Sequence, residues 1–320
     1  MHIVVTGANG FVGTALARTL AVRPNVHVLA VSRTLPSGLG AQVRFRSLDS
    51  VLDGRDGKLI AEPGGVIVHT AGRAHVTREK SRNSLQEFRQ VNVEMSLQLA
   101  RRAATAGIGR FIYLSSVKVN GENAESACPF TADDTPAPQD AYGVSKMEAE
   151  QALREFVSHT NMELVIIRPP LVYGPGVKAN FRTLLRMVNL GIPLPLGAVD
   201  NKRSFIGLDN LIDLIVACIE HPAAANQTFL ASDTEDLSTP ELLRRIGVAL
   251  GRPARILRVP QSILELGARF TGTGDTLKRL CASLCVDPSK VQQQLGWTPP
   301  FSFDAGLLRT AQGFLNETRR

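Results

Sequence analysis

The sequence predicts an α/β fold in which a doubly wound parallel sheet is joined to a smaller, mixed C-terminal lobe. Short apolar runs typical of strands alternate with helical patterns through the first half of the chain. This order builds a parallel sheet with helices on both faces. After residue 168 prolines and glycines interrupt the pattern, and shorter helical patterns follow. We therefore expect a smaller lobe that closes over the open edge of the sheet.

Five apolar runs are the candidate strands, at residues 2–6, 26–31, 65–70, 111–114 and 164–168. The clearest helical pattern covers residues 82–106, where an apolar stripe is formed by Leu85, Phe88, Val91, Met95 and Leu99. Gly107 then stands where a helix commonly ends. Later helices are expected near residues 179–190, 208–220, 239–250 and 260–269.

The composition is that of a soluble globular protein, with 44% hydrophobic and 20% charged residues. The chain opens into an apolar strand without the pattern of a signal peptide, and no apolar run reaches a membrane span. We expect a cytoplasmic protein without membrane insertion. The net charge of +7 comes from scattered lysines and arginines, so no nucleic-acid partner is expected. The four cysteines and six histidines lack metal-ligand spacing, so no metal is expected.

A glycine-rich turn follows the first strand and precedes a helical pattern. Its glycines, Gly7, Gly10 and Gly13, are spaced three apart. Such a turn lets backbone amides approach a pyrophosphate, and the start of the next helix adds partial positive charge. The sequence therefore predicts a Rossmann-type dinucleotide site, with contacts expected from Gly7, Asn9, Gly10, Phe11, Val12 and Gly13.

The end of the second strand bears on which nicotinamide dinucleotide binds. An acidic residue there would bind the adenosine ribose of NAD, whereas an arginine would accommodate the 2′-phosphate of NADP. Ser32 and Arg33 follow the strand, and no carboxylate does. We therefore expect NADP(H), with NAD(H) still possible because Arg33 could simply be solvated.

Several motifs occur together in the order of a known family. They are TGANGFVG (6–13), HTAG (69–72), LSS (114–116), YGVSK (142–146) and IRPP (167–170). The chain thereby resembles the extended short-chain dehydrogenases/reductases, and within them the nucleotide-sugar epimerase/dehydratase group. The segments RSFI (203–206), DPSK (287–290) and LGW (295–297) look like that group's substrate-lobe motifs.

The resemblance implies a division of the chain into two parts. Residues 1–168 would bind NAD(P), and residues 204–232 would return to that domain. Residues 169–203 and 233–320 would form the substrate-binding lobe. Relatives often form homodimers through two helices, here residues 82–106 and the helix after Tyr142.

The resemblance also implies Ser116, Tyr142 and Lys146 as the catalytic residues, and elementary chemistry agrees. Moving a hydride to or from a carbonyl carbon requires a proton transfer at its oxygen. A free tyrosine, with a pKa near 10, is a poor base at neutral pH, and a nearby ammonium lowers that pKa. Lys146 is placed for this because it lies four residues after Tyr142 on the same helix face. Ser115 is the alternative serine.

Further contacts are implied by the same resemblance. The cofactor would also meet Ala71, Gly72, Asn92, Tyr142, Lys146 and Pro169. The nucleotide-sugar substrate, with UDP as the expected nucleotide, would meet Asn180, Arg203, Tyr173 and Arg279. An arginine clamps a diphosphate well because of its fork-shaped guanidinium. Lys278 is an alternative to Arg279, since the match to the family is loose there.

The residues directly after Ser115 limit which reactions of the group are expected. Dehydratases of the group carry Thr-Asp-Glu where this chain has Ser116, Val117 and Lys118, so dehydration is not expected. The Ser32-Arg33 end suits a reductase that draws on NADPH. We therefore expect a 4-ketoreductase of UDP-4-keto-6-deoxy-N-acetylhexosamines in surface-polysaccharide synthesis. A UDP-hexose or UDP-N-acetylhexosamine 4-epimerase is the alternative, and a non-catalytic NADP(H)-sensing regulator is a third possibility.

Overall fold

The structure is a computed structural model of the chain. It describes residues 1–36, 38–54, 64–73, 84–125, 127–260, 262–264, 266 and 274–318, except the side chains of residues 275, 276 and 279. The prediction for residues 260–269 therefore lies largely outside the described part.

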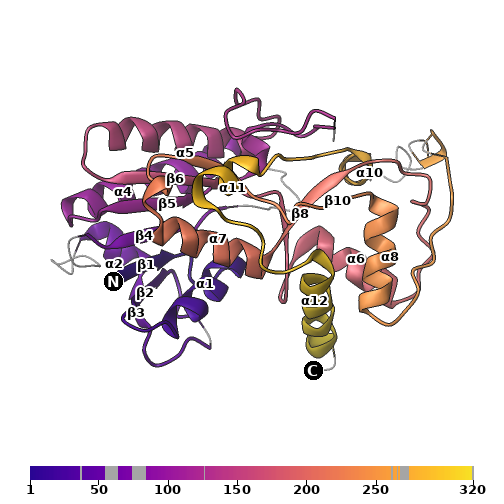
Figure 1. Cartoon of the computed structure of the whole chain (residues 1–320), viewed down its shortest axis with the longest axis horizontal. Helices are drawn as coiled ribbons and strands as arrows, with labels where there is room; N and C mark the ends of the chain where they lie inside the picture. Colours follow the sequence, from indigo (N-terminus) through magenta and orange to yellow (C-terminus); the bar gives the residue numbers. More distant parts are fainter. Residues whose placement is uncertain are drawn as a thin grey trace.

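A seven-stranded parallel sheet forms the larger part of the molecule (Figure 1), in the order β3-β2-β1-β4-β5-β6-β9. Its strands are β1 (His2–Thr6), β2 (His27–Ser32), β3 (Arg44–Ser47), β4 (Val66–His69), β5 (Arg110–Leu114), β6 (Glu163–Arg168) and β9 (Thr228–Leu230). Every pairing in it is parallel. The predicted doubly wound parallel sheet is confirmed, and the five predicted strands lie within about two residues of β1, β2, β4, β5 and β6.

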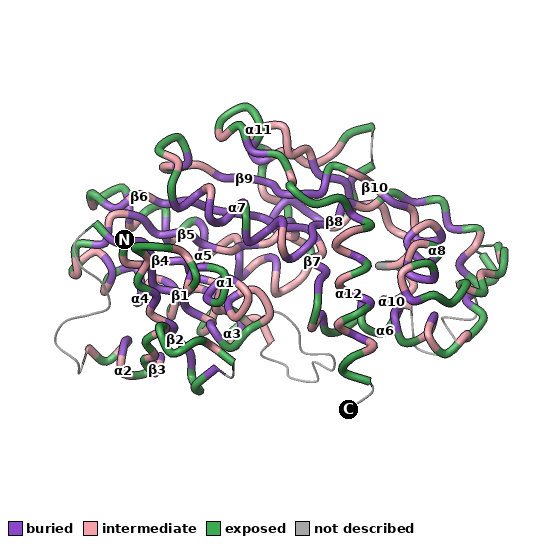
Figure 2. Tube along the Cα trace, turned by 60° about the horizontal axis from the view of Figure 1, so that its bottom comes forward, coloured by how far each residue is buried: buried purple, intermediate pink, exposed green. Residues whose placement is uncertain are grey.

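Helices cover both faces of this sheet because its strands are apolar on both sides. On one face Ile3 and Val5 pack with α1 (Phe11–Ala21) and α7 (Leu208–Glu220). On the other, Val4 packs with α2 (Leu48–Asp53), α4 (Met95–Thr105) and α5 (Ala141–Ser158). The alternation follows from the two-residue period of a strand. Figure 2 shows the buried strands between the half-exposed helices.

The long helix predicted over residues 82–106 is interrupted where it is described. It consists of α3 (Ser84–Arg89), a π-helical turn at Gln90–Glu94 and then α4. Asn92 lies in that turn and is fully buried. Such single π turns inside helices often occur at functional sites.

A second sheet of three strands lies beside the large one. It contains β7 (Leu171–Tyr173), β8 (Arg203–Gly207) and β10 (Asp236–Leu237) in the order β10-β8-β7. β7 pairs with β8 in parallel, and β10 pairs with β8 antiparallel. The smaller lobe is therefore mixed, as expected.

Residues 203–230 contribute to both sheets. α7 packs on the large sheet, and β9 is one of the strands of that sheet. β8 belongs to the small sheet. α11 (Ser289–Leu295) packs on the large part through Val291, and Trp297 donates to Asp213 of α7 at 2.7 Å.

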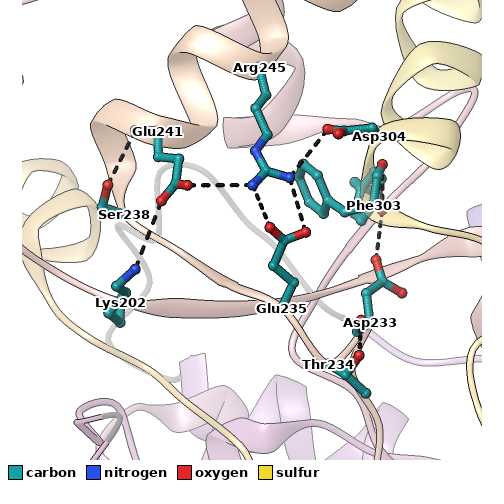
Figure 3. Close-up of polar contacts among 10 residues, drawn as sticks. Lys202, Asp233, Thr234, Glu235, Ser238, Glu241, Arg245, Phe303 and Asp304 are labelled. Atoms are coloured by element: carbon teal, nitrogen blue, oxygen red, sulfur yellow. Dashed lines mark hydrogen bonds and ion pairs between the residues drawn. The ribbon is translucent and has the colours of Figure 1, made fainter.

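The small lobe has its own apolar core, built from α6 (Ala179–Asn189), α8 (Thr239–Ala249) and α12 (Phe303–Thr318). α10 (Gly274–Cys281) packs at its edge, and short turns lie at Val117–Val119 and Pro222–Ala224. Figure 3 shows Arg245 of α8 joining Glu235 and Asp304, which ties α8 to the β10 side and to α12. Among the described residues, no helix is both long and apolar enough to span a membrane.

Candidate active site

The glycine turn brings three backbone segments into contact at the carboxyl end of β1. Gly7 has a φ of +71°, and a Cβ on it would lie 2.6 Å from the amide nitrogen of Ala71. A Cβ on Gly13 would lie 2.2 Å from the carbonyl oxygen of Gly7. The amide of Gly10 donates to that same oxygen at 2.8 Å. Only glycine fits at Gly7 and Gly13, because these contacts leave no space for a side chain.

The start of α1 is open to an anion. Its N-cap, Gly10, provides no side-chain hydrogen bond, and no acidic residue lies in the first turn. The first amides of a helix lack partners within the helix, and they carry partial positive charge. Asn9 and Gly10 are exposed, and Phe11 and Val12 are half-buried. The turn predicted from the glycines therefore fits the pyrophosphate of a dinucleotide.

The residues at the end of β2 are arranged around Thr34. Ser32 is buried, and its hydroxyl donates to the carbonyl oxygen of Thr34 at 2.7 Å. Asn9 donates to the Thr34 hydroxyl at 3.1 Å. The side chain of Arg33 is exposed beside them. Arg33 thus lies at the same edge as the glycine turn, whereas the Ser32 hydroxyl is already engaged.

Lys146 is buried against the carboxyl end of β5. Its ammonium donates to the carbonyl oxygen of Leu114 at 2.9 Å and lies 4.5 Å from the centre of the Tyr113 ring. A Cβ on Gly72 would lie 3.3 Å from this ammonium, so the β4 and β5 ends meet here. Burial lowers the pKa of Lys146 to about 8, although the Glu150 carboxylate favours its charged form.

Ser116 lies close to Tyr142 at the start of α5. Tyr142 is half-buried in the first turn of α5, with its ring 6.0 Å from that of Phe88. Burial raises the pKa of Tyr142 to about 12, a hydrogen bond with the Ser116 hydroxyl opposes this, and the Asp140 carboxylate adds to it. The two side chains therefore interact just beyond the carboxyl end of β5.

The alternative serine, Ser115, points elsewhere. It is buried, and its hydroxyl donates to Glu150 at 2.5 Å. Glu150 in turn binds Arg168 within the interior. Because successive residues of an extended chain point to opposite sides, Ser116 is the one that faces Tyr142.

Asn92 supports the loop after β4 and the start of α5. Its side-chain oxygen accepts from the amide of Arg73 at 2.9 Å, and its nitrogen donates to the Ser145 hydroxyl at 2.9 Å. The Ser145 hydroxyl donates to the carbonyl oxygen of Tyr142 at 2.8 Å. The buried amide of Asn92 thus has partners, and they fix Tyr142 relative to the π turn.

Pro169 and the HTAG turn complete the edge of the site. Pro169 is buried, and its carbonyl oxygen accepts from the amide of Val117 at 3.0 Å, directly after Ser116. Ala71 is half-buried and Gly72 exposed. These residues follow the carboxyl ends of β4 and β6, the edge at which open α/β sheets bind ligands.

Sequence reasoning assigned no role to His69, although it lies within the HTAG motif. It is fully buried, 2.6 Å from the Thr6 hydroxyl through Nδ1 and 2.9 Å from the Ser96 hydroxyl through Nε2. Because Ser96 donates to the carbonyl oxygen of Asn92, it accepts from Nε2. Burial, with a smaller contribution from Lys146, lowers the pKa of His69 to about 3. His69 is therefore neutral.

The residues expected to contact the substrate differ in how far they are exposed. Tyr173 corrects the expectation, because it is fully buried and its hydroxyl donates to Asp233 at 2.6 Å. It packs in the core of the small lobe rather than lining a sugar site. Asn180 is exposed in the first turn of α6. Arg203 is half-buried and donates to the carbonyl oxygen of Ala282 at 3.0 Å. The Arg279 side chain lies outside the described part.

The described residues contain no group of three or more histidine, cysteine, aspartate or glutamate side chains arranged to hold a metal ion. The four free cysteines are Cys128, Cys218, Cys281 and Cys285.

The fold is shared with solved sugar-nucleotide enzymes. The chain is similar to UDP-glucuronic acid 4-epimerase from Bacillus cereus, solved with NAD, with a TM-score of 0.79, 20% identity and 99% of each chain covered. It is also similar to UDP-glucose 4-epimerase from Thermotoga maritima, solved with UDP-glucose, with a TM-score of 0.78 and 21% identity over the whole of both chains. At these identities the likeness concerns the fold.

A closer likeness comes from sequence. The chain is 43% identical to the UDP-glucose 4-epimerase of Vibrio cholerae over 99% of this chain and 97% of that protein. Residues 3–231 match the model of the NAD dependent epimerase/dehydratase family. The chain therefore belongs to the NAD-dependent epimerase/dehydratase family.

Proposed function

We propose that the protein is an NAD-dependent 4-epimerase of a UDP-hexose or UDP-N-acetylhexosamine. Family membership and the 43% identity to a UDP-glucose 4-epimerase support this reaction more strongly than the ketoreductase expected from the sequence. The observation that carries the chemistry is the placement of Ser116 beside Tyr142, with Lys146 one turn further along α5 and its ammonium bound to the carbonyl oxygen of Leu114. Because the likeness to the Vibrio protein spans both chains, it covers the substrate lobe too.

In this proposal the glycine turn and the start of α1 hold the pyrophosphate, and Lys146 donates to the nicotinamide ribose. When bound, a dinucleotide would supply the hydride acceptor and donor for C4. Tyr142 takes the proton from the C4 hydroxyl and returns it, and Ser116 hydrogen-bonds the same oxygen. The pKa of about 12 belongs to the ligand-free protein, and a nearby positive charge lowers it.

Substrate contacts are proposed for Arg203, the first residue of β8, and Asn180, in the first turn of α6. Burial lowers the pKa of Arg203, with nearby groups including Glu122 opposing the shift. A diphosphate would favour the charged guanidinium more strongly, and the fork geometry suits it. Arg279 is proposed as a second residue that binds the diphosphate.

The epimerase is tested with freshly purified protein and no added cofactor. We expect mass spectrometry to find NAD released on denaturation, and UDP-glucose and UDP-galactose, or their N-acetylated forms, to interconvert. A protein that carries no dinucleotide and converts none of these sugars without added cofactor would overturn the epimerase.

A second candidate is the 4-ketoreductase of a UDP-4-keto-6-deoxy-N-acetylhexosamine, acting in surface-polysaccharide synthesis. One observation favours it: Ser32 and exposed Arg33 follow β2, where a carboxylate would suit NAD. The NADP preference that this implies is not supported by the Bacillus cereus relative, which was solved with NAD. The candidate predicts NADPH oxidation with the keto sugar, and a shift towards NADH in the Arg33→Asp variant. An unchanged NADPH/NADH ratio in that variant would remove Arg33 from cofactor selection.

We also propose a cytoplasmic homodimer that pairs through α3–α4 and α5. Size-exclusion chromatography with light scattering tests the dimer, and a monomer of 34.5 kDa across micromolar concentrations would contradict it.

A further inference from the structure

An ion pair joins the two segments that carry Ser116 and Tyr142. Lys118 lies two residues after Ser116, and Asp140 lies two residues before Tyr142. The Lys118 ammonium contacts the Asp140 carboxylate directly and binds Glu122 at 2.6 Å. The side chains of these three residues are 24%, 32% and 32% exposed, so the cluster lies at the edge of the site.

Each member of the pair is also built into its own segment. The Ser116 hydroxyl accepts from the amide of Lys118 at 3.3 Å, which caps the short turn Val117–Val119. Asp140 is the N-cap of α5 and accepts from the amide of Gly143 at 2.7 Å. A Cβ on Gly143 would lie 2.8 Å from the carbonyl oxygen of Lys118, so the two backbones touch.

We propose that Lys118 and Asp140 are positioning residues, which hold the Ser116 segment against the first turn of α5 and balance the charge beside the phenol of Tyr142. The proposal rests on the proposed catalytic roles of Ser116 and Tyr142. Lys118 occupies the position at which dehydratases of the group carry a glutamate. Neither residue needs to touch the substrate for this role.

Asp140 is the carboxylate that acts on Tyr142, and its negative charge disfavours the phenolate. Burial alone would raise the pKa of Asp140, but hydrogen bonds from Lys118 and the Gly143 amide outweigh it, so the pKa is lowered. Asp140 is therefore ionised at neutral pH, and the Lys118 ammonium offsets its effect on the phenol.

Other charges face Tyr142 from each element packed against it. On α5 these are Asp140, which acts on the phenol, and Lys146 one turn further along, and on β5 the Tyr113 phenol is affected by Tyr142. The loop after β5 brings Lys118 and Glu122, and the Arg73–Glu87 pair lies beyond Phe88. Of these charged groups, Lys118 contacts Asp140 directly and also binds Glu122.

The test separates charge from helix capping. Asp140→Asn keeps a good N-cap acceptor for Gly143 but removes the charge, because asparagine and aspartate cap helices about equally well. Lys118→Met removes the cation and leaves the carboxylates, and Lys118→Arg restores a cation. Glu122→Gln is the control, since it removes a carboxylate that also binds Lys118 but, unlike Asp140, does not cap α5.

The readout is the ionisation of Tyr142 in the full chain, followed by NMR of ¹³Cζ-labelled tyrosine. The chain has three tyrosines, and the Tyr142→Phe variant assigns the relevant signal. We expect the Tyr142 midpoint to fall by roughly half a unit to one unit in Asp140→Asn and to rise by a similar amount in Lys118→Met. Lys118→Arg and Glu122→Gln should leave it near that of the wild type.

The pH profile of kcat/KM should move in the same directions as the NMR midpoints. Midpoints that stay unmoved in both Asp140→Asn and Lys118→Met would overturn the proposal, as would an equal shift in Glu122→Gln. Because the NMR readout does not need turnover, it is independent of the proposed reaction. Full activity of Tyr142→Phe would instead overturn the proposed function and leave the charge balance to be judged on NMR alone.

Discussion

The carboxylate of Glu150 is bound by the guanidinium of Arg168, with Nη2 2.6 Å and Nε 2.9 Å from its two oxygens. Both side chains are almost fully buried, at 3% and 4% exposure. Glu150 lies one helical turn beyond Lys146 on α5, and Arg168 ends β6. Ser115 and Asn120 complete the network, so the pair fixes α5 against the sheet directly beneath the site.

Removing one partner of this pair should be costly. Glu150→Ala leaves the Arg168 guanidinium buried without its carboxylate, and such changes cost about 3–5 kcal/mol. Urea unfolding measures the loss. Glu317→Ala is the matched control, because its partner Arg182 is on the surface and both side chains are more than 40% exposed; exposed pairs are worth about 0–1 kcal/mol. Equal losses in the two variants would contradict this account.

Acid should weaken the fold through His69. The unfolded chain takes up a proton at this histidine below about pH 6.5, whereas the folded protein takes it up only near pH 3. The free energy of unfolding therefore decreases as the pH is lowered through that window. From about pH 7 to about pH 5 this one residue should cost about 2 kcal/mol. His69→Gln should lose correspondingly less over the same interval.

The control for this pH effect is His159→Gln, whose side chain is 75% exposed. It should follow the wild-type dependence on pH. If His69→Gln and the wild type lose the same free energy of unfolding between the two pH values, His69 is not buried in its neutral form.

The glycine turn should not tolerate a methyl group. In Gly13→Ala the new Cβ would meet the Gly7 carbonyl at 2.2 Å, so the turn or α1 must shift. Overpacking of this kind costs about 1–3 kcal/mol, and we expect dinucleotide binding, measured by calorimetry, to be lost. Gly109→Ala is the control, because its Cβ would meet only ordinary contacts, the nearest at 3.6 Å. Wild-type affinity in Gly13→Ala would remove the turn from the cofactor site.

Much of the large sheet could be predicted because its strands are apolar on both faces and stand out as runs. β3 could not, since its four residues, Arg44–Ser47, alternate charge at an exposed edge. β9 has only three residues, and its pairing with β6 depends on a return of the chain from the small lobe. The π turn at Asn92 leaves the apolar stripe unbroken, so the pattern of residues 82–106 could not reveal it.

In the candidate site, too, some residues could be placed from the sequence and others could not. Spacing along one helix placed Lys146 beside Tyr142, and motif order brought Ser116 to them. Tyr173 was misjudged because its burial depends on Asp233, sixty residues later in the chain. His69 was visible in a motif, but its neutral state depends on burial between Thr6 and Ser96, which no local pattern shows.

The most direct test of the central claim is the turnover of Tyr142→Phe with the UDP-sugars named above, measured beside its dinucleotide affinity. We predict that kcat falls by about 10²–10⁴-fold, the usual contribution of a positioned acid–base group, while the dinucleotide binds as in the wild type. A variant that binds the dinucleotide normally and turns over at the wild-type rate would show that this phenol does not transfer the proton.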